Sequence, residues 1–178
     1  MRMRSNIFGS ILMIGFASYS GLRWLQTGYL FFVLLFIKNL AVAFFLLKRR
    51  NKTSSKESLR ITFLSYLSSA IPVFYLRGSL LVSSNLYLFC TLVTILGYTL
   101  STLSLFDLGY SFGISPAKRD LVRSGVYKYL NHPMYLGYGI SEFPFILIQP
   151  LNGILYLLSI SLYFFRAREE SFIHRKSN

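Results

Sequence analysis

The sequence predicts an all-α protein built as a polytopic bundle of transmembrane helices, with about five to six membrane segments. Of its 178 residues, 53% are hydrophobic and only 14% are charged, and the mean hydropathy is +0.50. A soluble domain of this length needs more polar surface to cover its core. Long apolar runs separated by short basic loops point to a membrane protein. We expect one integral-membrane domain over residues 1–178, with N-terminal spans in 1–108 and a more polar C-terminal region in 109–178.

The first half predicts four spans, over residues 7–22, 26–47, 61–76 and 85–108. The first is shorter than the ~20 residues that cross a bilayer, so its ends are expected at the interface. We interpret it as a retained helix, because no small-residue cleavage site follows it. Pro72 is expected to kink the third span, which a surrounding bundle can tolerate.

The C-terminal region predicts an interfacial segment followed by a helical hairpin. Residues 111–131 are too polar to span a bilayer, yet their apolar residues recur at spacings that suit a segment lying on the membrane surface. Two short apolar runs follow, at 134–148 and 151–165, joined by Gln149 and Pro150. At ~1.5 Å per residue each run covers only part of a ~30 Å hydrocarbon core. We therefore expect either a tilted hairpin or a partly re-entrant one.

The basic residues predict the orientation. Of the 19 lysines and arginines, all but Arg23, Lys38 and Arg77 fall before the first span, in alternate loops or after the last span. The positive-inside rule then places both termini in the cytoplasm, and a prokaryotic inner membrane is the expected location. This placement in short loops argues against nucleic-acid binding. Cys90 is the single cysteine, so no disulfide framework or thiol-rich metal site is expected.

Two polar patches on the predicted cytoplasmic side gather the chemically capable residues, at 124–137 and 166–170. The first patch could simply be an aromatic anchor, with Pro133 opening a helix and Asn131 or His132 as its cap. The combination of Tyr127, His132 and Tyr135 with helix-breaking residues favours a site instead. No second ligand lies at a useful spacing from His132, so we expect no metal.

The motifs LVRSGVYKYLNHPMYLG and RAREE resemble the isoprenylcysteine carboxyl methyltransferase and phospholipid methyltransferase superfamily. These integral-membrane enzymes use S-adenosylmethionine. The resemblance covers about residues 105–172 and implies that residues 109–178 form a methyltransferase-like cofactor-binding region. It implies an acidic pair, Glu169 and Glu170, of which Glu169 would approach the cofactor's ribose hydroxyls or amino group. The resemblance also implies that a set of residues in the first patch walls the cofactor pocket: Leu121, Val122, Tyr127, His132, Pro133, Met134 and Tyr135.

Physical chemistry gives independent reasons for the same roles. A water-soluble cofactor needs a site that opens to the cytoplasm, and its sulfonium is stabilised by tyrosine faces. Arg166 or Arg168 can bind a carboxylate through a forked pair of hydrogen bonds, either on the cofactor or on the acceptor. The expected acceptor is a lipid or lipidated molecule that arrives from the bilayer. An isoprenylcysteine-like carboxylate would need an arginine, and a phospholipid amine would need a carboxylate such as Glu142.

Several alternatives stay open at this stage. Glu142 could equally form a structural pair with Lys38. Asn131 replaces the arginine that usually precedes His-Pro in the family, with Lys128 as a possible substitute. Only eight residues follow Glu170, whereas relatives carry a longer tail that helps to close the site. A pseudo-enzyme of this fold, a non-catalytic membrane bundle and a membrane oxidoreductase resembling sterol reductases are the competing interpretations.

Overall fold

The computed structural model describes residues 2–48, 59–78, 83–114 and 122–175, and within these ranges it contains helices and no strands. The α-helices and the short 3-10 turns (η) are α1 (Arg2–Thr27), α2 (Leu30–Lys48), α3 (Leu59–Ala70), η1 (Ile71–Phe74), α4 (Ser84–Leu108), η2 (Gly109–Ser111), η3 (Gly125–Lys128), α5 (Pro133–Glu142), α6 (Pro144–Ile148) and α7 (Asn152–Arg175). The all-α prediction is confirmed for the part of the chain that the structure describes.

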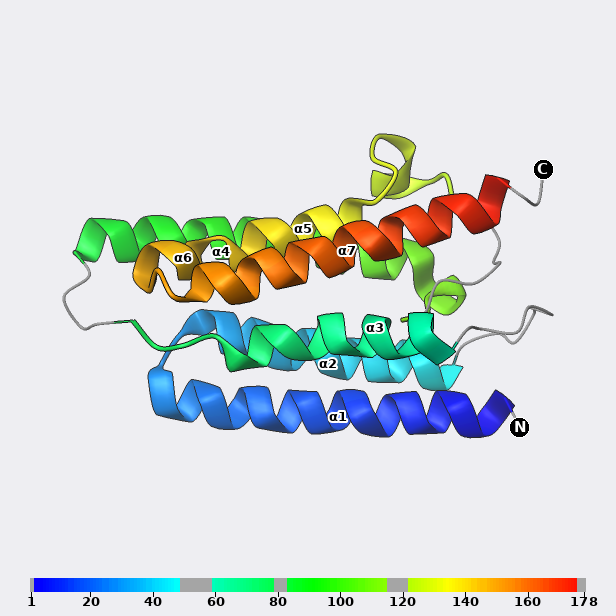
Figure 1. Ribbon diagram of the computed structural model, residues 1–178, viewed down its shortest axis with the longest axis horizontal. Coiled ribbons are helices and arrows are strands. Elements are labelled where there is room, and N and C mark those ends of the chain that lie inside the picture. The colour runs from blue at the N-terminus through cyan, green and yellow to red at the C-terminus, as the bar shows by residue number, and fades with distance from the viewer. Residues whose placement is uncertain (1, 49–58, 79–82, 115–121, 176–178) are drawn as a thin grey trace.

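The helices lie roughly along one axis and form an elongated bundle (Figure 1). The pair α1–α2 packs along one side, and α4 runs beside α5 on the other. Helix α7 contacts both α3 and α5, and so connects the two halves of the chain. The start of α1, the end of α7 and the turn η3 all lie at the same end of the bundle (Figure 1). The two polar patches of the sequence therefore meet at one end.

Prolines set the helix boundaries around the site. Pro72 lies in η1, where the α-helix α3 gives way to a 3-10 turn; the kink expected there stays a prediction. Pro133 opens α5 with His132 at the N-cap position, although the His132 side chain makes no capping hydrogen bond. The expected single run over 134–148 is divided into α5 and α6, because Pro144 has no N–H to bond the carbonyl of Ile140.

Helices α4 and α5 approach closely because glycines remove the side chains between them. A Cβ added at Gly137 would lie 2.7 Å from both the Gly97 carbonyl oxygen and the Ser101 nitrogen. A Cβ at Gly97 would meet the backbone of Ser141 and Gly137 in the same way. Small residues at a helix crossing are typical of membrane bundles. This contact holds the start of α5, and with it His132, against α4.

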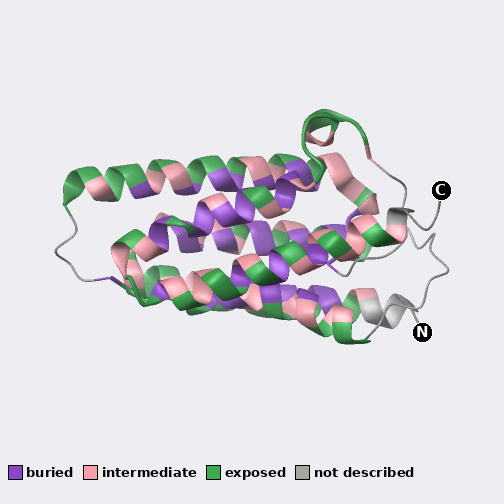
Figure 2. Ribbon diagram, turned by 45° about the horizontal axis from the view of Figure 1, so that its top comes forward, coloured by how far each residue is buried: buried purple, intermediate pink, exposed green. Residues whose placement is uncertain are grey.

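Many large apolar side chains are exposed on the surface, and Figure 2 shows that exposed residues lie on the outer faces of the helices and buried ones between them. Large apolar side chains such as Leu88, Leu96 and Phe106 are more than half exposed on α4. Two helical stretches, Leu30–Lys48 and Ser84–Ser111, are long and apolar enough to cross a membrane. The larger number of spans expected from the sequence stays a prediction.

Replacing Gly137 by Ala should push α4 and α5 apart. Overpacking of a closely packed interface costs about 1–3 kcal/mol, so the midpoint of thermal unfolding in detergent should fall. Gly15→Ala on α1 is a matched control, because a Cβ there meets nothing within 4 Å. Equal unfolding midpoints for the two variants would contradict the close crossing.

Candidate functional site at the start of α5 and the end of α7

The start of α5 and the end of α7 form a polar cluster of four side chains. Tyr135 donates a hydrogen bond from its hydroxyl to Glu170 Oε1 at 2.7 Å. His132 Nδ1 lies 3.6 Å from Glu170 Oε2, and His132 Nε2 lies 2.9 Å from Ser171 Oγ. His132 and Glu170 are about a quarter exposed, at 29% and 24%. The cluster is therefore ordered by its own contacts and still open to a ligand.

The surroundings shift the pKa of Glu170 in the cluster and that of Tyr127 in the neighbouring turn. Burial opposes the charged form of Glu170, but bonds from His132 and Tyr135 and the charge of Arg166 outweigh it and lower the pKa of Glu170. Glu170 is therefore a carboxylate at neutral pH. Burial and the nearby Glu170 carboxylate raise the pKa of Tyr127, so this tyrosine stays neutral and can donate a hydrogen bond.

Arg166 lies on α7 one turn before Glu170 and is almost fully buried, with 3% of its surface exposed. Its guanidinium lies over the Tyr135 ring, 4.9 Å from the centroid. Nη1 donates to Ser68 Oγ at 2.9 Å and Nη2 donates to the Ile114 carbonyl at 2.7 Å. Nε is buried and has no hydrogen-bond partner among the residues that the structure describes. The Arg166 guanidinium is thus fixed beside the polar cluster by hydrogen bonds from Nη1 and Nη2.

Glu142 lies deeper in the bundle, in a second and fully buried cluster. Its Oε1 accepts a hydrogen bond from Tyr163 at 2.6 Å and its Oε2 accepts one from Tyr75 at 2.9 Å. Lys38 on α2 places its ammonium 4.2 Å from the centre of the Tyr138 ring, one turn before Glu142 on α5. The two charges attract each other. Both carboxylate oxygens are therefore engaged, and Glu142 is only 2% exposed.

The turn that carries Tyr127 is tied to the end of α4 by Asp107. The Asp107 carboxylate accepts a hydrogen bond from the Val126 backbone N–H at 2.8 Å. Gly125 precedes that N–H with a φ of +57°, and a Cβ there would collide with the Asp107 carboxylate. The position therefore requires glycine for both conformation and space.

Two depressions border the polar cluster. One, of about 410 Å³, opens along the end of α7 and is lined by Phe165, Arg168, Glu169, Ser171 and Phe172. The other, of about 340 Å³, is an apolar groove between α4, α5 and α7, lined by Val93, Tyr135, Leu136, Gly139, Ile140, Phe143, Tyr156 and Ile160. Ser171 belongs to the first and Tyr135 to the second. We call the first the polar groove, because the side chains of Arg168, Glu169 and Ser171 line it beside two phenylalanines. The cluster lies between this groove and the apolar one.

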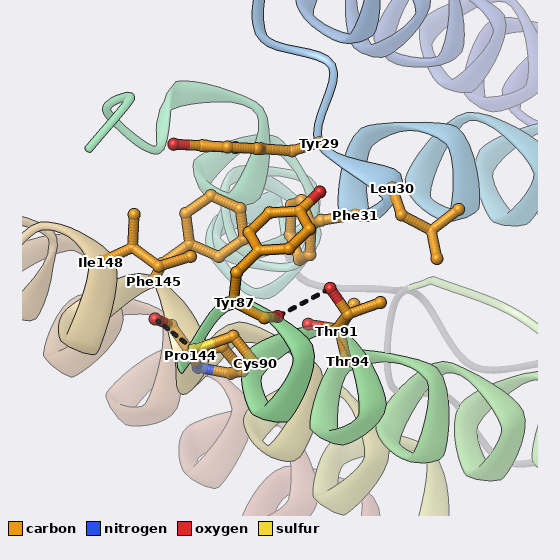
Figure 3. Close-up of a pocket in the computed structure, with 10 residues that line it drawn as sticks. All are labelled: Tyr29, Leu30, Phe31, Tyr87, Cys90, Thr91, Thr94, Pro144, Phe145 and Ile148. Carbon is orange, nitrogen blue, oxygen red and sulfur yellow. Dashed lines mark hydrogen bonds between the residues drawn. The ribbon is translucent and has the colours of Figure 1, made fainter. Parts of the chain in front are cut away.

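A third pocket lies around the start of α4 and the α6 turn, and is lined mainly by aromatic and aliphatic side chains (Figure 3). Its polar groups are engaged with other protein atoms: for example, Thr91 donates to the Tyr87 carbonyl, and Cys90 Sγ lies 3.9 Å from the Pro144 carbonyl oxygen. The enclosed space is about 20 Å³, which holds about one water molecule. This pocket is too small for a cofactor.

The structure brings together only part of the residue set predicted from the sequence. His132, Tyr135, Arg166 and Glu170 contact one another, whereas Arg168 and Glu169 face the polar groove beside them. The others are apart from this cluster or outside the described residues. Pro133 and Met134 are buried, and Met134 belongs to the hydrophobic core. Val122 and Tyr127 are half buried, Leu121 lies outside the described residues, and Glu142 lies in the deeper cluster.

A family comparison covers this whole region. A model of the phospholipid methyltransferase family matches residues 75–176, more than half of the chain. The chain belongs to the phospholipid methyltransferase family. No curated protein and no solved structure matches the chain.

Membership of the phospholipid methyltransferase family implies a membrane methyltransferase. The matched region runs from Tyr75 through α4, α5 and α6 into the end of α7, and so contains the polar cluster and both grooves. The match begins at residue 75, whereas the resemblance described from the sequence motifs begins at about residue 105. Helices α1, α2 and α3 lie outside it, although Ser68 on α3 contacts Arg166.

Sequence reasoning missed two residues that position the polar cluster and the turn beside it. Asp107 is an acidic residue at the end of a predicted span, and Ser68 is one of several serines in an apolar helix. The signal for Asp107 was present, since it is one of only six acidic residues and it ends a predicted span. Nothing in the sequence singles out Ser68, because its contact with Arg166 spans 98 positions.

Replacing Asp107 by Ala should release the turn at 125–128. The Val126 amide would lose its hydrogen-bond acceptor, so its hydrogen exchange should become at least roughly tenfold faster, in line with a loss of ~1.5 kcal/mol for a bond to a charged group. Asp107→Asn keeps an oxygen acceptor and should be affected less. Exchange at 122–131 that is the same in Asp107→Ala and the wild type would show that the carboxylate does not hold the turn.

Proposed function

We propose that the protein transfers a methyl group from S-adenosylmethionine to a lipid-borne acceptor at the cytoplasmic face of the membrane. The observation that carries this proposal is the polar cluster of His132, Tyr135 and Glu170 between a polar groove and an apolar groove. One water-soluble substrate and one lipid substrate require such a junction. The family name favours a phospholipid amine as the acceptor, with an isoprenylcysteine-like carboxylate as the alternative.

The residues at the junction fit S-adenosylmethionine. The polar groove, about 410 Å³ in volume, is within the range of small-molecule sites. Glu169 in this groove can accept hydrogen bonds from ribose hydroxyls or an amino group, and Arg168 can bind a carboxylate. When bound, the cofactor supplies a methyl group on a positively charged sulfur, which a nucleophile takes by in-line displacement.

The protein's contribution is then positioning and exclusion of water. Arg166 is held under Tyr135 by two hydrogen bonds, so its positive charge lies next to the junction and would attract an anionic group of the acceptor. A phosphate or a carboxylate on the acceptor would serve equally. The apolar groove that begins at Tyr135 is suited to the hydrocarbon chain of that acceptor. Holding both reactants in line accounts for most of the expected acceleration.

Glu142 and Glu170 have different roles in this proposal. Glu142 is bonded at both oxygens and lies with Lys38 in the deeper cluster, so its contacts favour the structural interpretation over that of a base. Glu170 is charged and half buried at the junction. It is better placed to attract a cationic amine, and the adjacent His132 can accept a proton.

The proposal also includes the membrane arrangement. The start of α1, the end of α7 and the turn η3 lie at one end of the bundle (Figure 1). We propose that this end faces the cytoplasm, since the positive-inside rule favours the basic loops on that side. The polar groove would then open to cytoplasmic S-adenosylmethionine, and the apolar groove to the bilayer. The remaining apolar helices would accompany α2 and α4 through the membrane.

The test is methyl transfer by the purified protein in liposomes. With labelled S-adenosylmethionine, label should enter phosphatidylethanolamine and not a farnesylcysteine carboxylate supplied in a parallel sample. Glu169→Gln should weaken cofactor binding about tenfold, the effect of losing ~1.4 kcal/mol of hydrogen bonding to a charged group. Lys48→Gln, at an exposed position at the end of α2, is a control that should bind normally.

Label in the carboxylate sample alone would overturn the amine assignment and keep the methyltransferase. No label in either lipid and no binding of S-adenosylmethionine would overturn the proposed function. Unchanged affinity in Glu169→Gln would remove this residue from the site.

A further inference from the structure

Ser68 on α3 is fully buried and its hydroxyl is used twice. Its Oγ donates to the Ser65 carbonyl at 2.8 Å and accepts the hydrogen bond from Arg166 Nη1 at 2.9 Å. A serine that bonds back to its own helix has its hydroxyl hydrogen engaged, so a lone pair faces outward. Ser68 is therefore a pre-oriented acceptor for the guanidinium.

The backbone carbonyl of Ser68 contacts a tyrosine of α7. The Ser68 carbonyl oxygen lies 3.3 Å from the Tyr163 hydroxyl, which is also 2.6 Å from Glu142 Oε1. The Tyr163 and Tyr135 rings are stacked, with centroids 6.1 Å apart and an interplanar angle of 14°. Ser68 thus touches the face of α7 that presents both Arg166 and Tyr163, and Tyr163 in turn stacks on Tyr135 of α5.

Arg166 has few other contacts that fix its direction. The Ile114 carbonyl holds Nη2, and the Tyr135 ring lies against the guanidinium face. Without the Ser68 hydroxyl, Nη1 would join Nε as an unsatisfied donor in a buried environment. Leaving a charged donor buried without an acceptor is costly, so the guanidinium would turn toward another acceptor. Its position against Tyr135 would then be lost.

We propose that Ser68 is a positioning residue for methyl transfer, which orients Arg166 from a helix outside the matched family region. This inference rests on the proposed function, because its effect is exerted through Arg166 on the acceptor. It makes α3 part of the active site and assigns a functional role to a segment that the family match does not include.

Ser69 supplies a matched control. It lies next to Ser68 on α3, and its hydroxyl bonds the same Ser65 carbonyl at 3.2 Å. Ser69→Ala therefore removes the same group from the same helix without an Arg166 contact. Ser68→Thr keeps a hydroxyl, and Ser68→Cys keeps the size with a sulfur that is only a weak acceptor.

The experiment measures kcat and KM for both substrates, and thermal unfolding, in these variants and in an Arg166→Lys background. Ser68→Ala should lower kcat/KM for the lipid about 10- to 30-fold, with the KM for S-adenosylmethionine within about twofold of the wild type. Ser69→Ala should stay within about twofold throughout, and Ser68→Thr should recover most of the loss. In the Arg166→Lys background, Ser68→Ala should have little further effect, because contacting residues are not additive. If Ser68→Ala does not fold, Ser68→Cys provides the same comparison.

An equal loss in Ser68→Ala and Ser69→Ala would overturn the inference, since both would then act through helix stability. A full additional loss in the Arg166→Lys background would overturn it as well. If the wild type is active, either of these two results overturns only the role of Ser68 and leaves the proposed function unaffected. If the wild type is inactive, both the proposed function and this inference are overturned.

Discussion

The structure depends on the cost of placing charged side chains inside an apolar bundle. An ionisable residue in a membrane interior is stable only where other helices supply partners. Arg166 meets this constraint with Ser68 from α3, Ile114 and the Tyr135 ring, and Glu142 meets it with two tyrosines. These partners come from segments far apart in the chain. The charged groups therefore specify how the N-terminal half packs on α5 and α7.

The same contacts explain why one end of the bundle can hold two different substrates. The glycine crossing of α4 and α5 fixes the start of α5, and the Asp107 bond fixes the turn before it. Helix α7 then delivers Glu170 to His132 and Tyr135, with Glu169 on the adjacent groove. Arg166 and Glu142, which are buried deeper in the bundle, are hydrogen-bonded to protein groups. The exposed part of the cluster remains available for a cofactor and an acceptor.

Much of this organisation is visible in the sequence, because composition and proline positions report local preferences. The apolar runs predict helices, Pro72 and Pro133 mark their tightening and start, and the two polar patches meet as expected. Long-range pairing is not visible, since a serine such as Ser68 looks like any other in an apolar helix. Nor does the sequence show which of Glu169 and Glu170 contacts His132, because one residue changes the direction of a helical side chain by ~100°. The break at Pro144 could have been read from the missing N–H.

The central claim is that residues 122–135 and 165–173 form one cofactor site. Hydrogen–deuterium exchange of the protein in detergent, with and without S-adenosylmethionine, tests it most directly. Binding should slow exchange in both segments together and leave α1 unchanged. Protection in only one segment, or protection confined to the pocket around Tyr29 and Cys90, would contradict the account.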